Sequence, residues 1–123
     1  MSTRIREYHR PQHTQEAADL LRRATPLVIS PKPVAFEDIS AESVVDLSRL
    51  DLNYIKATDG LIHIGALTPL SDLVDSPVLQ SHASGLLPEA AHLSAHRGLR
   101  HLATVGGVLM ASDGPPEVLL ALL

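Results

Sequence analysis

The spacing of apolar and polar residues predicts short strands and helices that alternate along the chain. Apolar positions recur at helical intervals in residues 14–24, where Thr14 is the expected N-cap and arginines follow near the end. Short apolar runs predict strands at Leu27–Ile29 and Ser43–Leu47, and residues 8–11 indicate a short extended segment. Because strands and helices interleave without an internal repeat, the pattern favours an α+β or α/β fold.

A β-hairpin is predicted around Asp59 and Gly60. Runs rich in apolar residues, 54–57 and 61–66, flank this pair. A tight two-residue turn needs positive φ, which glycine adopts at no steric cost. The two runs are therefore expected to pair as antiparallel strands.

Further helices are predicted after the hairpin. Thr68-Pro69 and Ser76-Pro77 each place a hydroxyl at the N-cap and a proline at the first helical position. A third helix is expected to begin near Leu87, after a break at Gly85. The apolar run Val118–Leu123 predicts a helix without a polar face. Its partner surface is expected on the absent remainder of a longer domain or on another subunit.

The composition narrows the possible functions. The 123 residues fit one compact domain spanning residues 1–123, and 45% of them are hydrophobic, enough to build a core. A net charge of −4, with two tyrosines, one phenylalanine and no tryptophan, argues against nucleic-acid binding. Without cysteine there are no disulfides, thiolate zinc sites or protein-ligated iron–sulfur clusters. No secretory signal and no apolar run of membrane-spanning length is present in the sequence, so a cytoplasmic location is expected.

Candidate catalytic and metal-binding side chains are sparse. Glu89, His92 and His96 are spaced to share one helix face, which suits a nitrogen and carboxylate metal site. A solvated helix face explains the same spacing, and the HExxH pattern is absent. No serine lies in a G-x-S-x-G elbow. We therefore predict neither a metal site nor a catalytic side chain.

The segment Thr104-Val105-Gly106-Gly107 is the best candidate for ligand binding. Two adjacent glycines after an apolar run allow close approach of a ligand and present N–H groups to phosphate oxygens. Thr104 adds a hydroxyl, and Arg100 is close enough in sequence to offset phosphate charge. A purely structural Gly-Gly turn is the alternative interpretation.

An ordered series of motifs across nearly the whole chain resembles one family. The motifs are Tyr8-x-x-Pro11, Glu16–Leu21, Val45-Asp46-Leu47, Leu61–Thr68, Ser76-Pro77, Leu87–Ala91, Leu99–Gly107 and Leu119–Leu122. Together they resemble the FAD-binding domain of the molybdenum hydroxylases, found in the medium subunit of carbon monoxide dehydrogenase and in the flavin domain of xanthine dehydrogenase.

This resemblance implies a fold, a cofactor and partners. It implies an α+β fold of two lobes with FAD between them, the chain covering the first lobe and the start of the second. Two glycine-bearing loops would hold the pyrophosphate, and the flavin would carry electrons between an iron–sulfur partner and an external acceptor. The implied partners are a molybdopterin-binding large subunit and an iron–sulfur small subunit. The residues that it assigns to FAD are Thr104, Val105, Gly106, Gly107 and Asp113.

The chain also departs from the family pattern. Where the family has its first glycine loop, the sequence reads Ser30-Pro31-Lys32-Pro33, which holds no glycine. After Gly107 the family usually has asparagine, and this chain has Val108. A second hypothesis is therefore a degenerate homologue without FAD that serves as an assembly or scaffold subunit. Its apolar C-terminus would then dock on a partner or on a second copy of the chain.

Overall fold

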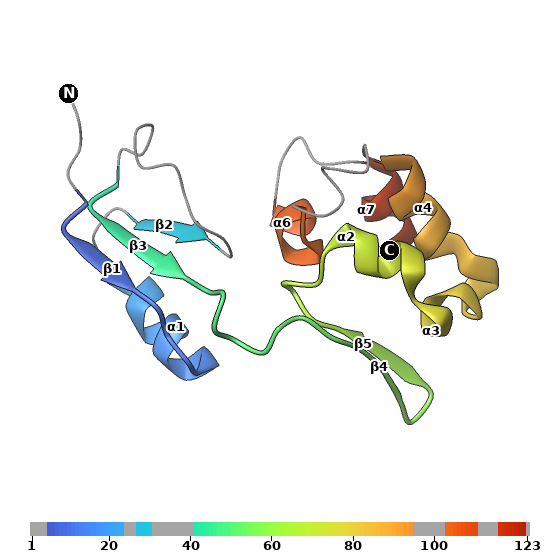
Figure 1. The fold of residues 1–123 in the computed structure, drawn as a ribbon, viewed down its shortest axis with the longest axis horizontal. Helices are drawn as coiled ribbons and strands as arrows, with labels where there is room; N and C mark the ends of the chain where they lie inside the picture. The colour runs from blue at the N-terminus through green and yellow to red at the C-terminus, as the bar shows by residue number, and fades with distance from the viewer. Residues whose placement is uncertain (1–4, 24–26, 31–40, 95–102, 111–115, 123) are drawn as a thin grey trace. The chain divides into compact units, whose positions relative to one another are not determined.

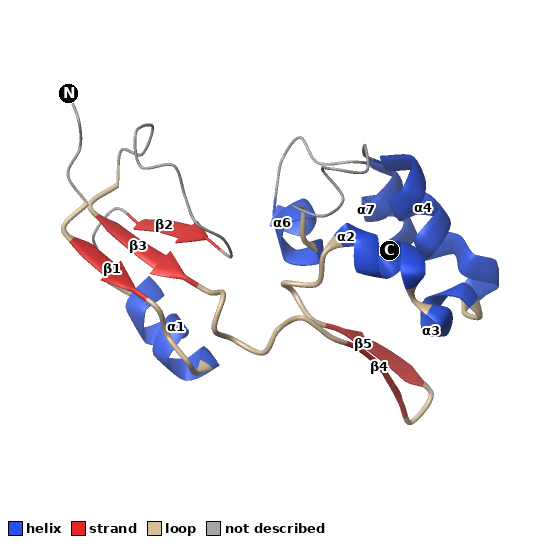
Figure 2. Cartoon of the chain, in the orientation of Figure 1, coloured by secondary structure: helices blue, strands red, loops and turns tan. Residues whose placement is uncertain are grey.

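The computed structural model describes residues 5–23, 27–30, 41–94, 103–110 and 116–122 (Figures 1 and 2). Contacts divide the chain into two compact units, Met1–Asp51 and Leu52–Leu123. Both strands and helices occur, in agreement with the predicted α+β class. That the two units work as one domain stays a prediction.

The first unit is a three-stranded parallel sheet with one helix. The strands lie in the order β1-β3-β2, so β3 pairs on both sides. Both faces of β3 are buried, which suits its run of valines. The elements are β1 (Glu7–His9), α1 (Thr14–Leu21), β2 (Leu27–Ser30) and β3 (Ser43–Asp46).

Helix α1 starts differently from the prediction. Thr14 is the first helical residue, and His13 occupies the N-cap without a side-chain cap bond. Glu16 fastens this end instead, because its carboxylate accepts the backbone N–H of Gln12 at 3.2 Å. This bond joins the first turn of the helix to the residue before its N-cap, and it places the carboxylate near the positive end of the helix.

The second unit begins with the predicted hairpin. Strands β4 (Ile55–Thr58) and β5 (Leu61–Ile64) pair antiparallel, with Thr58 opposite Leu61. Asp59 and Gly60 have φ of 52° and 76°, as a two-residue hairpin turn requires. This prediction is confirmed.

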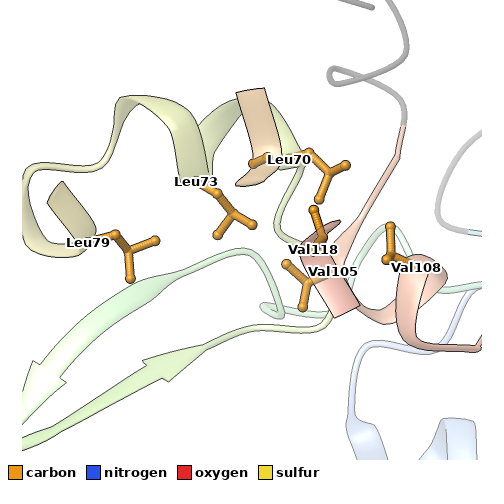
Figure 3. Packing of buried hydrophobic residues seen from close by; sticks show 7 residues of the cluster. Leu70, Leu73, Leu79, Val105, Val108 and Val118 are labelled. Carbon is orange, nitrogen blue, oxygen red and sulfur yellow. The ribbon is translucent and has the colours of Figure 1, made fainter. Parts of the chain in front are cut away.

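Helices complete the second unit and bury its core. Figure 3 shows side chains of Leu70, Val105 and Val118 converging from three helices. The buried cluster consists of Leu70, Leu73, Leu79, Ala91, Val105, Val108 and Val118. The helical elements are α2 (Leu70–Asp75), α3 (Pro77–Gln80), the 3-10 helix η2 (Ala83–Gly85), α4 (Leu86–Ser94), α6 (Val105–Met110) and α7 (Pro116–Leu122).

Two predicted helix caps have different outcomes. Ser76 caps α3 as predicted, since its hydroxyl accepts the N–H of Leu79 at 3.4 Å and Pro77 follows it. The predicted cap at Thr68 is wrong, because Pro69 is the N-cap of α2. The buried Thr68 hydroxyl instead accepts the N–H of Tyr54 and donates to its carbonyl, both at 3.2 Å. It thereby joins the segment before the hairpin to the segment after it.

The apolar C-terminal run forms helix α7, as predicted. Val118 is fully buried in the core and α7 packs against α4, so the helix has a partner within its own unit. Leu120 is 71% exposed. The expectation that the partner surface lies elsewhere is therefore wrong for the Val118 side of the helix. Among the described helices none has the length and apolar character to cross a bilayer.

Candidate functional site

The Thr104–Gly107 segment begins helix α6 and does not form a Gly-Gly turn. Thr104 makes an isolated antiparallel bridge with Pro69, and helical structure starts at Val105. The Thr104 hydroxyl accepts the N–H of Gly107 at 3.1 Å, and its carbonyl accepts the N–H of Val108 at 3.0 Å. Thr104 thus acts as a side-chain N-cap, which explains a threonine at this position.

The first N–H groups of α6 all have acceptors within the same unit. Val105 donates to the Thr68 carbonyl at 3.0 Å, and Gly106 donates to the Ala66 carbonyl at 2.8 Å. The N–H groups of Gly107 and Val108 are taken by Thr104. The helix start is therefore fastened to the segment that follows the hairpin, and these four groups do not form an open cradle for phosphate.

The two glycines meet different surroundings. A Cβ at Gly106 would lie 2.9 Å from the Ala66 carbonyl oxygen and 3.1 Å from the Ala66 Cβ. Among the described residues, a Cβ at Gly107 would meet only the Thr104 hydroxyl oxygen within 4 Å, at 3.0 Å, and Gly107 is exposed. Packing against Ala66 accounts for Gly106, whereas the outer side of Gly107 is open to close approach by a ligand.

Of the other residues considered for this site, Val108 lies in the core, and Asp113 and Arg100 lie outside the described residues. Val108, where the family usually has asparagine, is buried in the apolar cluster, so its place in the core gives a packing reason for the change. The Pro31-Lys32-Pro33 segment also lies outside the described residues.

The histidine-bearing helix is also partly described. Glu89 and His92 lie on α4, and His96 falls outside the described residues. Within the described ranges no three His, Asp or Glu side chains gather as a metal site would require.

The parallel sheet of the first unit carries a second polar cluster at the carboxyl ends of its strands. Asp46, only 4% exposed, ends β3. Its carboxylate accepts the Tyr8 hydroxyl at 2.5 Å and the Ser48 N–H at 2.9 Å. Arg10 pairs with the same carboxylate, its Nε lying 3.2 Å from Oδ2. The buried charge is thus compensated by three partners.

The contacts in this cluster lower the pKa of the Asp46 carboxyl group and raise the pKa of the Tyr8 hydroxyl. Burial raises the pKa of Asp46, but the hydrogen bonds from Tyr8 and Ser48 and the charge of Arg10 outweigh it and hold the pKa below its ordinary value. The hydrogen bond to Asp46 raises the pKa of the Tyr8 hydroxyl above its ordinary value. Asp46 is therefore ionised and Tyr8 neutral at pH 7.

Sequence reasoning assigned no role to this cluster. Tyr8 and Asp46 are 38 positions apart and belong to separate motifs of the sequence. A usable signal exists, because a carboxylate at the end of a buried strand needs a partner from a neighbouring strand end. Tyr8 lies in β1 and Arg10 directly follows the strand, two positions later, so in extended backbone the two side chains lie on the same side.

The chain matches the family described as the FAD binding domain in molybdopterin dehydrogenase over residues 3–123. It belongs to this family. A nicotinate dehydrogenase FAD-subunit from Eubacterium barkeri is 29% identical over 87% of this chain and 39% of its own length. A carbon monoxide dehydrogenase medium chain from Hydrogenophaga pseudoflava is 32% identical over 82% of this chain and 38% of its own length. The chain therefore spans about two fifths of the length of these relatives.

Solved structures agree with this assignment. A chain of carbon monoxide dehydrogenase from Hydrogenophaga pseudoflava, in a form lacking the Mo-pyranopterin moiety, superposes with a TM-score of 0.72 at 29% identity. It covers 89% of this chain and 40% of its own. Quinoline 2-oxidoreductase from Pseudomonas putida 86 superposes with a TM-score of 0.75 over 92% of this chain and 42% of its own, at 23% identity, which speaks for the fold alone.

Proposed function

We propose that this chain is the FAD-binding, electron-transferring part of a molybdenum hydroxylase-type oxidoreductase. The family match over residues 3–123 is the observation that carries the proposal. The nicotinate dehydrogenase FAD-subunit and the carbon monoxide dehydrogenase medium chain support it. When bound, FAD supplies the redox chemistry, and the chain supplies binding and orientation.

We further propose that Thr104, Val105, Gly106, Gly107 and Asp113 contribute to the FAD site as the resemblance implies. The structure favours contact with FAD through the open surface at Gly107 over hydrogen bonds donated by the backbone N–H groups. The N–H groups of Val105, Gly106 and Gly107 are bonded within the unit, while the exposed side of Gly107 admits a ligand at close range. Val105 supports this surface from the core.

Titration of the purified full chain with FAD tests this proposal. Quenching of flavin fluorescence is expected to reveal binding, whereas a chain that never quenches the flavin contradicts it. Gly107→Gln places a long side chain on the open side of the glycine and is expected to weaken FAD binding about tenfold. Leu109→Gln, the same substitution at an exposed position of the same helix, is the matched control and is expected to bind as wild type.

The scaffold hypothesis is the second candidate. The bonded N–H groups at the start of α6 are compatible with it, whereas the FAD-subunit relative supports the first proposal. The scaffold hypothesis predicts a folded chain that does not quench flavin fluorescence. The same titration therefore separates the two hypotheses.

The partners belong to the proposal as well. We propose a molybdopterin-binding large subunit and an iron–sulfur small subunit, since a carbon monoxide dehydrogenase medium chain is among the relatives that match. Affinity purification of the tagged chain from its native host, followed by mass spectrometry, is expected to recover both. A homo-oligomer and a cytoplasmic location stay predictions.

A further inference from the structure

The second unit has a hollow of about 360 Å³ between the hairpin turn and the end of α3. Helix α3 contacts β4, and Figure 1 shows it beside the hairpin. The residues that line the hollow include the apolar Leu61, Ile62 and Val78 and the polar Asp59 and His82. Small-molecule sites combine apolar walls with a few polar groups, and this volume lies at the lower end of their usual range.

The backbone is fixed on both sides of this hollow. On one side, Asp59 and Gly60 form the two-residue hairpin turn, both with positive φ. On the other side, the His82 N–H donates to the Leu79 carbonyl at 3.1 Å, and the His82 carbonyl accepts the Gly85 N–H at 3.0 Å. The polar side chains that line the hollow therefore extend from backbone that need not rearrange when a ligand binds, which lowers the cost of binding.

The segment directly after His82 has an unfavourable backbone conformation. Ala83, Ser84 and Gly85 have φ of 49°, 57° and 74° in succession. Only glycine adopts this region without a steric cost, and other residues held there cluster at ligand-binding sites. The strained segment therefore supports a binding role for this side of the hollow.

Asp59 brings a negative charge to the hollow. Its carboxylate makes no hydrogen bond or ion pair with any described residue. The cation nearest to it in sequence, Lys56, lies over the Tyr54 ring instead, with its Nζ 5.0 Å from the ring centroid. A metal ion would need several carboxylate or imidazole ligands, and the described ranges hold no group of three such side chains. The hollow therefore favours an organic cation over a metal ion.

We propose that this hollow binds a small organic cation that carries an ammonium group on an apolar body. The ammonium group pairs with Asp59, and the apolar body covers Val78 and Leu61, whose side chain is 62% exposed. Removing the surface of this leucine from water adds to the attraction between the two charges. None of these residues is among those proposed for FAD, so the site goes beyond the proposed function and does not depend on it.

Titration of the full chain with phenethylammonium, followed by amide NMR spectra, tests the site. Saturable shifts are expected in residues 57–62 and 78–82, with a Kd on the order of 1 mM. Phenethyl alcohol, the neutral analogue, is expected to bind about three- to fivefold more weakly, because it lacks the charge. A titration without saturable shifts, or with shifts confined to other residues, overturns the proposal.

Asp59→Asn removes the charge and keeps the turn, because Asn-Gly suits a two-residue hairpin turn as well as Asp-Gly does. It is expected to weaken the binding of phenethylammonium about three- to fivefold and to leave that of phenethyl alcohol unchanged. Asp75→Asn is the matched control, since Asp75 is exposed in the same unit, carries the same charge and is not among the described residues that line the hollow. It is expected to bind as wild type, and equal weakening by both substitutions contradicts a pairing with Asp59.

Leu61→Thr tests the contact with the apolar body of the ligand. Threonine suits a strand, so the hairpin is expected to persist, while the loss of apolar surface weakens phenethylammonium binding about threefold. Leu86→Thr is the matched control, because Leu86 is 52% exposed on α4 and is not among the described residues that line the hollow. A Leu61→Thr variant that binds as tightly as Leu86→Thr contradicts the proposal.

Discussion

At the scale of single residues, glycine positions report how closely backbone segments approach one another in the second unit. Gly106 lies against the Ala66 carbonyl, and Gly65 lies against the Leu52 carbonyl. Neither has positive φ, so the requirement is space and not backbone conformation. The Gly65 contact joins the segment after the hairpin to the residues before the hairpin. The Gly106 contact joins the same segment to α6.

Gly106→Ala is expected to destabilise the protein by about 1–3 kcal/mol, because the new Cβ meets backbone that cannot rotate away. This loss exceeds the gain of up to about 1 kcal/mol that alanine brings to a helix. Gly107→Ala is the comparison, since its Cβ meets a side-chain oxygen and no backbone atom of another described segment. Urea unfolding measures the stability of both variants. A Gly106→Ala variant that is as stable as Gly107→Ala, or more stable, contradicts the tight contact.

Asp46 is expected to make the stability of the protein sensitive to acid. Its pKa is lowered in the folded state, so its contribution is full above the unfolded pKa, near 3.8, and is lost as pH falls through the folded pKa. Asp46→Asn is expected to lower the unfolding free energy by about 1–3 kcal/mol at pH 7. The difference from wild type should shrink below about pH 4.

Urea unfolding at several pH values measures this effect. Asp51→Asn serves as the control, because Asp51 is exposed and carries no hydrogen bond or ion pair among the described residues. A difference between wild type and Asp46→Asn that stays constant down to pH 2 contradicts the role of the ionised carboxylate.

At the scale of elements, helix α7 shows how an apolar run without a polar face is accommodated. Val118 points into the core, as Figure 3 shows, while Leu120 on the same helix is exposed. Leu122 packs at the margin of the same cluster. The spacing of Val118 and Leu122 is one helical turn, so these two residues satisfy the usual periodicity and Leu120 does not.

Val118→Ala is expected to lower the unfolding free energy by about 1–3 kcal/mol, because it leaves a cavity between α4 and α7. Leu120→Ala is expected to change it by less than about 0.5 kcal/mol in the isolated chain. Thermal unfolding followed by circular dichroism distinguishes the two. If Leu120→Ala proves as costly as Val118→Ala, Leu120 is buried in solution against another surface.

At the scale of the whole molecule, each unit has its own means of cohesion. The first depends on the valines of β3 and on the bonds around Asp46, and the second on the helical cluster around Leu73. Units with separate cores unfold separately when the contacts between them contribute little to stability.

Leu73→Ala is expected to cost about 2–5 kcal/mol in the second unit. Amide hydrogen exchange followed by mass spectrometry should accelerate in residues 52–123 and remain unchanged in residues 5–51. Val44→Ala, a fully buried position of β3, is the reciprocal variant and should affect the first unit alone. Acceleration throughout the chain would indicate one cooperative domain, as the sequence predicts.

The sequence by itself determined the turns, caps and strands that depend on neighbouring residues. The Asp59-Gly60 turn, the Ser76 cap and the strands around Val28 and Val44 follow from neighbouring residues, so their patterns predicted them correctly. The ordered motifs also predicted the family, which the match over residues 3–123 confirms.

Tertiary structure decided which polar groups are already in use. The N–H groups of Val105 and Gly106 are bonded to carbonyls near residues 66–68, and Asp46 is bonded to a tyrosine 38 positions away. A glycine pair reads the same in sequence whether its N–H groups face a ligand or another segment. Only long-range packing supplies the acceptor, and with it the distinction between a phosphate cradle and a fastened helix start.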